Sequence, residues 1–131
     1  MSGSPALHAM YLLDSDILVD HLRGRRSLEA LARELSCALN HFQTSLISVV
    51  ELYTGKYDTT NVERLLSYLP HILISLETAK MAGELRRKYG LGVGDAIIAA
   101  TALKERLVLV TRNLRHFSQI EGLDLRSPKE M

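Results

Sequence analysis

Short apolar runs alternate with segments of helical periodicity along this chain, and this alternation is the strongest constraint on its fold. Runs typical of buried strands lie at residues 10–13, 44–47, 71–75 and 107–110, with a last short strand expected at 123–125. Because helical segments separate these runs, successive strands are expected to run in the same direction. The sequence therefore predicts an α/β domain whose mostly parallel sheet is covered by helices on both faces.

The predicted helices are bounded by residues with known capping and stopping preferences. Ser27 is expected to cap a helix that reaches Asn40, Pro70 to end another helix, and Gly90 to stop a third. The expected helical segments are residues 17–22, 28–39, 49 onward, 62–69, 78–89, 93–106 and 114–117. The segment at 93–106 is rich in alanine, which predicts a helix lying close against the sheet.

Length and composition indicate one ordinary globular domain. The 131 residues carry a formal net charge of +1, so no excess of positive charge points to a nucleic-acid partner. Cys37 is the only cysteine, which excludes an intramolecular disulfide and a cysteine-rich zinc site. We expect a cytoplasmic protein with no membrane contact, a single domain at residues 10–131, and at residues 1–9 a leader or a segment added during cloning.

Polar side chains gather where the predicted strands end. The first strand is followed by Asp14 and Asp16, and Asp95 opens the alanine-rich helix. The other polar residues after strand ends are Ser48, Glu51, Thr111 and Asn113. Since ligands of open parallel sheets bind at the carboxyl ends of the strands, these side chains are expected to converge.

Each of these residues also has a purely structural explanation. Asp16 and Asn113 are favoured N-cap types, and Asp95 lies where the helix dipole favours a carboxylate. Ser48 and Glu51 have the spacing of a capping box. A functional interpretation therefore rests on the coincidence of these residues at one edge of the sheet.

Converging carboxylates repel one another, and the motifs around Asp14, Glu51 and Asp95 contain no lysine or arginine. A divalent cation would relieve this repulsion. Ligands that are all oxygen atoms favour Mg²⁺, or Mn²⁺, over zinc. The sequence thus predicts a magnesium site suited to phosphodiester chemistry.

Four motifs in this order carry a resemblance to a known family. They are LLDSDIL around Asp14, SVVELYTG around Glu51, GDAIIAATAL around Asp95 and LVTRNLRHF around Asn113. The chain resembles PIN-domain ribonucleases, in particular the VapC-type toxins of toxin–antitoxin pairs. The resemblance implies a three-layer α/β/α PIN-like domain and a Mg²⁺-dependent endoribonuclease.

The resemblance also implies roles for individual residues. Asp14 and Asp95 would be the main metal ligands, joined by Glu51 directly or through water, and Asn113 would support the far side of the site. Family members usually have asparagine where this chain has Asp16, so Asp16 is expected chiefly to cap its helix. Many PIN domains have a fourth acid near Asn113, and the amide here favours one metal over two. Ser48 and Thr111 are expected to support the site.

The substrate implied by the resemblance is RNA, cleaved internally. Two groups of arginines flank the acidic motifs and are expected to position RNA phosphates: Arg23, Arg25, Arg26, Arg112 and Arg115. His116 is expected to pack beside Phe117 rather than act in the reaction. The implied partners are a small antitoxin protein, a second copy of the chain in a homodimer, and promoter DNA reached only through the antitoxin.

Three other classes of protein share parts of this pattern. Haloacid-dehalogenase-like phosphatases also have Asp-x-Asp after the first strand, but they need a lysine beside the nucleophile and a second acid after Gly-Asp, where this chain has alanine after Asp95. A receiver domain needs a lysine where this chain has Arg112 and Asn113. A catalytically silent PIN-fold module that binds RNA or protein remains the main alternative to an enzyme.

Overall fold

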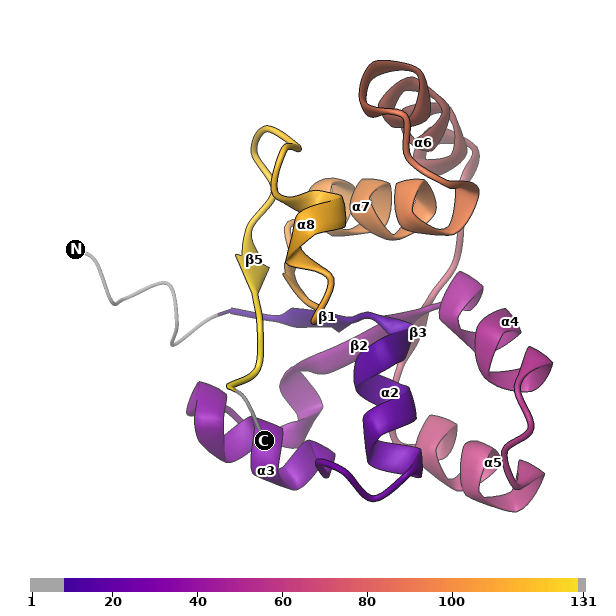
Figure 1. Ribbon diagram of the computed structural model, residues 1–131, viewed down its shortest axis with the longest axis vertical. Coiled ribbons are helices and arrows are strands. Elements are labelled where there is room, and N and C mark those ends of the chain that lie inside the picture. Colours follow the sequence, from indigo (N-terminus) through magenta and orange to yellow (C-terminus); the bar gives the residue numbers. More distant parts are fainter. Residues whose placement is uncertain (1–8, 130–131) are drawn as a thin grey trace.

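A computed structural model describes residues 9–129, and its centre is a five-stranded sheet (Figure 1). The strands are β1 (Tyr11–Leu13), β2 (Phe42–Ser45), β3 (His71–Ile72), β4 (Val108–Val110) and β5 (Leu125–Arg126). Their order is β3-β2-β1-β4-β5, and every pairing in the described residues is parallel. The predicted sheet is confirmed. The leader predicted at residues 1–9 lies, apart from Ala9, outside the described residues.

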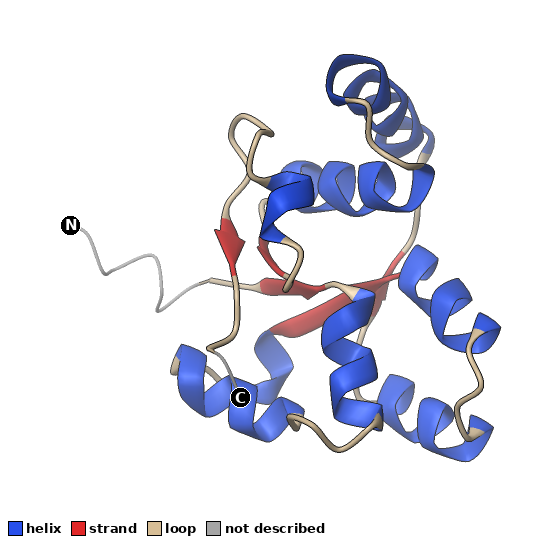
Figure 2. Cartoon of the chain, viewed as in Figure 1, coloured by secondary structure: helices blue, strands red, loops and turns tan. Residues whose placement is uncertain are grey.

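Helices cover both faces of the sheet and complete the predicted three-layer α/β/α arrangement (Figure 2). They are α2 (Ser15–Leu22), α3 (Leu28–Leu35), α4 (Leu46–Thr54), α5 (Thr59–Ser67), α6 (Leu76–Tyr89), α7 (Val93–Glu105) and α8 (Leu114–Phe117), with a short 3-10 turn η1 (Leu39–His41). In Figure 1, α6, α7 and α8 lie above the sheet, and α2, α3 and α5 lie below it.

The central strand β1 separates two hydrophobic cores because successive side chains of a strand point to opposite faces. Tyr11 and Leu13 pack into the core with α2, α3 and α5, whereas Leu12 packs into the core with α7 and α8. The buried alanines of α7 let this helix lie against the strands, as its composition predicts. A strand with both faces buried explains why residues 10–13 are a continuous apolar run.

Several predicted boundaries differ from the structure. The helix after Ser27 ends at Leu35, because Ser36 adopts a left-handed conformation with φ of 56°, and the prediction that it reaches Asn40 is wrong. Leu39 belongs instead to η1. The second strand begins at Phe42 and α4 already begins at Leu46, where residues 44–47 were expected to be strand.

The order of the strands brings three strand ends together at one edge of the sheet. β1 has β2 on one side and β4 on the other, so the residues that follow Leu13, Ser45 and Val110 are neighbours in space. Asp14 is the first residue beyond β1, and Thr111 is the first beyond β4.

Within residues 9–129, no helix is long and apolar enough to cross a membrane.

The two-sided burial of β1 makes a stability prediction. Leu12 is 0% exposed, so Leu12→Ala is expected to lower the free energy of unfolding by about 2–5 kcal/mol. Leu73, which is 69% exposed, is a matched control, and Leu73→Ala is expected to change it by less than about 0.5 kcal/mol. Urea denaturation measures both values, and equal losses would contradict the assignment of Leu12 to the core.

Candidate metal-binding and catalytic site

Asp14 is the most constrained carboxylate at this edge of the sheet. It caps the N-terminus of α2, and its Oδ1 accepts a hydrogen bond of 2.8 Å from the backbone N–H of Ser15. The Thr111 hydroxyl, from the end of β4, donates to its Oδ2 over 2.8 Å. Asp14 is buried. Its carboxylate is therefore fixed by two elements that are almost 100 residues apart in the chain.

The surroundings of Asp14 disfavour its charge. Burial is the largest cause, followed by the nearby carboxylate of Asp16 and then by that of Asp95, and together they raise the pKa of Asp14 to about 6. The hydrogen bonds from Thr111 and Ser15 oppose this rise without cancelling it. The predicted repulsion is thus present at Asp14, but it comes from Asp16 and Asp95; Glu51, which was expected to take part, is not among its causes.

Asp95 lies in the first turn of α7, as expected, and is paired with a histidine. The Nδ1 atom of His116 is 2.9 Å from the Asp95 Oδ2. His116 belongs to α8, and its side chain is 54% exposed. His116 lies beside Phe117 as predicted, with ring centroids 6.4 Å apart, and its exposed imidazole also contacts Asp95.

Asp16 does not cap α2, which corrects the expectation from sequence. Asp14 has that role, and Asp16 lies in the first turn of the helix. Its Oδ2 accepts the backbone N–H of Arg112 over 3.0 Å, and its Oδ1 is buried without a hydrogen-bond partner in the described structure. Asp16 therefore ties α2 to the loop after β4.

Asp20 is a buried carboxylate that sequence reasoning missed. Its Oδ2 is 2.9 Å from Nε of Arg112, and its Oδ1 is 3.7 Å from an Nη atom of Arg25. Asp16 and Asp20 are four residues apart and so share one face of α2. This spacing is the sequence signal that could have identified Asp20. This pair holds Arg112 close to the helix.

Ser48 and Glu51 do not form the predicted capping box. Ser45 caps α4, accepting the N–H of Ile47 over 3.2 Å, because the helix begins earlier than expected. Ser48 is consequently inside the helix, buried, and its hydroxyl is one of the buried polar groups without a partner in the described residues. Glu51 lies one turn further along α4 and is exposed.

The loop after β4 is built around the Thr111 hydroxyl. While it donates to Asp14, the same oxygen accepts the backbone N–H of Asn113 over 3.0 Å. Asn113 precedes α8 at the N-cap position, but its side chain makes no capping hydrogen bond. Asn113 is exposed, so its amide is available at the edge where Asp14 lies.

Two predicted RNA-positioning arginines lie at the far end of α2. Arg23 is the C-cap of this helix, about 13.5 Å from Asp14 by the rise of an α-helix. Its guanidinium lies 5.6 Å from the centre of the Tyr57 ring. Arg25, next to it, is exposed and paired with Asp20. These side chains are therefore less close to the acidic edge than the sequence suggested.

Arg26 has a structural role in this chain. Its guanidinium forms an ion pair with Glu34 of α3 and donates to the backbone carbonyl of Lys129 over 2.6 Å. Glu34 in turn accepts the backbone N–H of Lys129 over 2.8 Å. The side chain of Arg26 is only 14% exposed. The expectation that Arg26 contacts RNA is wrong, because it fastens the C-terminal segment to α3.

Arg112 and Arg115 do lie beside the acidic edge. Arg112 is half exposed despite its pairing with Asp20. Arg115 is exposed and lines an open hollow of about 280 Å³ together with Asp95 and His116. Asp95 is therefore open to solvent through this hollow.

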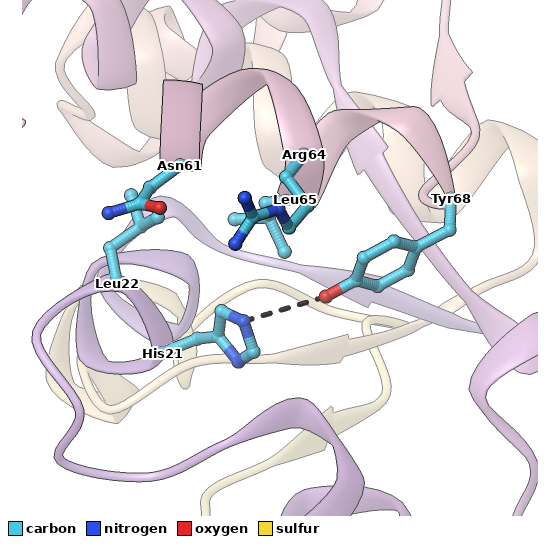
Figure 3. Close-up of a pocket in the computed structure, with 6 residues that line it drawn as sticks. All are labelled: His21, Leu22, Asn61, Arg64, Leu65 and Tyr68. Atoms are coloured by element: carbon cyan, nitrogen blue, oxygen red, sulfur yellow. Dashed lines mark hydrogen bonds between the residues drawn. The ribbon is translucent and has the colours of Figure 1, made fainter. Parts of the chain in front are cut away.

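A second hollow, of about 190 Å³, lies between α2 and α5 (Figure 3). His21, Arg64 and Tyr68 point toward one another across it, and the Tyr68 hydroxyl is 3.5 Å from Nε2 of His21. Its lining contains no carboxylate: His21, Leu22, Asn61, Arg64, Leu65 and Tyr68. It suits an anionic group and is not part of the candidate metal site.

The donor set fits a hard divalent cation, although the pocket for it is not fully assembled. Within the described part of the chain, no three acidic, histidine or cysteine side chains lie close enough together to hold a metal ion. The charge repulsion at Asp14 and the unpartnered Oδ1 of buried Asp16 are the features that a cation would satisfy. Two carboxylates with bound waters are a usual set for Mg²⁺.

Comparisons with known proteins agree with this fold. A family model described as PIN domain matches residues 11–123. Ribonuclease VapC19 of Mycobacterium tuberculosis is 32% identical over 121 residues, covering 87% of this chain and 97% of that protein. The chain therefore belongs to the PIN-domain family, among relatives that carry the name ribonuclease VapC.

Two solved structures are also similar. A toxin–antitoxin complex from Klebsiella pneumoniae has 35% identity and a TM-score of 0.75, covering 92% of this chain and 99% of the other. VapBC2 from Rickettsia felis, bound to a DNA fragment from its promoter, has 27% identity and a TM-score of 0.76 with the same coverage. The predicted relation to VapC-type proteins is confirmed.

The raised pKa of Asp14 predicts how pH affects stability. Because its pKa is about 6 in the fold and 3.8 ordinarily, the metal-free protein loses stability as pH rises from about 4 to 6. Asp14→Asn removes this loss and still provides a good N-cap. With chelator at pH 7, the variant is expected to be more stable by about 1–3 kcal/mol.

Chemical denaturation of both proteins at several pH values measures this effect. The advantage of Asp14→Asn is expected to shrink toward zero near pH 4, where the wild-type carboxyl is protonated. A variant that is less stable than wild type at pH 7 would show that the hydrogen bonds from Thr111 and Ser15 outweigh the cost of the buried charge.

Proposed function

We propose that this protein is a metal-dependent endoribonuclease that acts as the toxin of a toxin–antitoxin system. The observation that carries the proposal is the fixed, buried carboxylate of Asp14 beside Asp16 and Asp95 at the carboxyl edge of the sheet. The relatives named ribonuclease VapC support RNA as the substrate. The resemblance of the four sequence motifs to those of PIN-domain ribonucleases also supports RNA as the substrate.

In this proposal, Asp14 and Asp95 bind Mg²⁺, with Mn²⁺ as a possible substitute, and Glu51 joins them through water. When bound, the cation supplies a Lewis acid for the scissile phosphate and lowers the pKa of an attacking water. Asp14 can act without rearrangement, since Ser15 and Thr111 already hold its orientation. Glu51 is exposed on α4, so its side chain can turn toward the edge when a cation is present.

The remaining residues of the edge position the substrate. Asn113 offers an amide that can bind a phosphate oxygen or a water on the far side of the site, and Thr111 fixes the loop that carries it. Arg112 and Arg115 provide positive charge for the RNA backbone. Charge at these two positions would lower the repulsion between RNA and the aspartates during binding.

We also propose the partners that the related complexes suggest. The Klebsiella structure is a toxin–antitoxin complex and the Rickettsia complex contains promoter DNA, which supports a cognate antitoxin and DNA contact through it. Exposed apolar side chains on α4, at the start of α6 and at the start of α7 support a homodimer: Val50, Tyr53, Leu76 and Val93. An RNA substrate and a lone, unoxidised cysteine fit a cytoplasmic location.

A catalytically silent PIN-fold binding module is the second candidate. Asn113 in place of a fourth acid and the incompletely assembled cation pocket favour it. The buried charge of Asp14 argues for an enzyme, because carboxyl groups whose pKa is raised by burial and by neighbouring carboxylates cluster at functional sites.

Cleavage of a mixed pool of structured RNAs by the purified protein tests the proposal. We expect cutting with Mg²⁺, none with chelator, and none with Asp95→Asn. Mg²⁺-dependent stabilisation of the wild type without cutting would point to a missing RNA target. Absence of both cutting and metal binding would support the binding module.

Two neighbouring aspartates give a sharper test of the roles within the site. Asp14→Asn is expected to reduce cleavage by at least about 10²-fold, because it removes a metal-binding charge. Asp16→Asn keeps an acceptor for the N–H of Arg112 and is expected to remain within a few-fold of wild type. Initial rates of RNA cleavage at saturating Mg²⁺ measure both, and equal losses would contradict this division.

A further inference from the structure

The contact between Asp95 and His116 has no counterpart in the roles that the sequence motifs assign. We propose that His116 is a positioning residue for Asp95: its Nδ1–H donates to Oδ2 and so orients the carboxylate for Mg²⁺. The inference rests on the proposed function, since it assumes that Asp95 is a metal ligand. The contact measures 2.9 Å, an ordinary charge-assisted hydrogen-bond length.

The burial of Phe117 places His116 beside Asp95. Phe117 is completely buried in the core under α7 and fixes the short helix α8. His116 is the preceding residue; its ring lies 6.4 Å from that of Phe117, and 54% of its side chain is exposed. Packing beside Phe117 does not require an imidazole at such an exposed position, whereas the hydrogen bond to Asp95 does require its Nδ1.

The geometry of Asp95 shows why a positioning partner matters. Asp95 is in the first turn of α7, between Gly94 and Ala96, so its immediate neighbours in the chain leave its side chain room to rotate. The hydrogen bond to His116 restrains Oδ2 and leaves Oδ1 for a cation. Partners that hold metal-binding carboxylates typically change metal affinity by about 10–100-fold when they are removed.

The charged groups around Asp95 and His116 act on the Asp95 carboxylate in opposite directions. Asp95 raises the pKa of Asp14, which shows that the two carboxylates feel each other. Arg115 lines the same hollow from α8, next to His116 in the chain. An Asp95 side chain released from His116 could turn toward Arg115 and away from the cation, which is the error that His116 prevents.

Three substitutions of His116 separate the effect of its hydrogen bond to Asp95 from the effect of its side-chain volume. The amide nitrogen of asparagine can occupy nearly the place of the histidine Nδ1, whereas that of glutamine occupies the place of Nε2. His116→Asn can therefore keep the donor to Asp95, and His116→Gln and His116→Ala cannot. Ser118→Ala, an exposed substitution two residues away, is the control for general effects on α8.

Mg²⁺ affinity, measured by calorimetry and by the Mg²⁺-dependent shift in Tm, is the first readout. We expect His116→Ala and His116→Gln to bind Mg²⁺ at least about tenfold more weakly than wild type. His116→Asn and Ser118→Ala are expected to stay within about threefold. In RNA cleavage, the Ala and Gln variants are expected to lose rate at low Mg²⁺ and to recover at saturating Mg²⁺, which a general folding defect would not produce.

The outcomes distinguish this inference from the function on which it rests. If wild type binds Mg²⁺, Asp95→Asn does not, and all His116 variants bind equally, then the positioning role is wrong while the metal site stands. Tighter binding by His116→Ala would also overturn it, because His116 would then compete with the cation. If wild type itself binds no Mg²⁺, the metal-dependent function and this inference fail together.

Discussion

The hydrogen bond from Thr111 to Asp14 is the interaction on which the candidate site depends. It joins the ends of β1 and β4, and the same hydroxyl accepts the N–H of Asn113. One buried oxygen thereby sets the position of a carboxylate and the course of the loop that leads to α8. Because α8 carries His116 to Asp95, the Thr111 hydroxyl also governs the second carboxylate indirectly.

The same arrangement lowers the stability of the native state. Burial and neighbouring carboxylates raise the pKa of Asp14 to about 6, so its ionised form destabilises the native state at neutral pH. Natural proteins retain such a charge where it serves a site that a ligand completes. The buried Oδ1 of Asp16 and the buried hydroxyl of Ser48, both without partners among the described residues, lie in the elements around it.

The fold could be predicted from sequence because its signals are local and repeated. Continuous apolar runs identified β1 and β4, the Ser27 and Gly90 caps bounded α3 and α6, and the alanines identified α7. The predicted ends of helices were wrong where a single capping residue determines the boundary. Ser45 rather than Ser48 caps α4, and the left-handed Ser36 ends α3 early. Capping preferences alone do not distinguish such neighbouring residues, so the exact helix ends could not be predicted.

The sequence by itself determined the alternating strands and helices, and with them the edge at which Asp14, Asp95 and Asn113 would lie. Only the tertiary structure decided which partner each polar group takes. Packing between elements joined Asp14 to Thr111, paired Asp20 with Arg112, engaged Arg26 with Glu34 and brought His116 to Asp95. Periodicity reports which face of an element is buried, whereas pairing depends on distances between elements that only packing fixes.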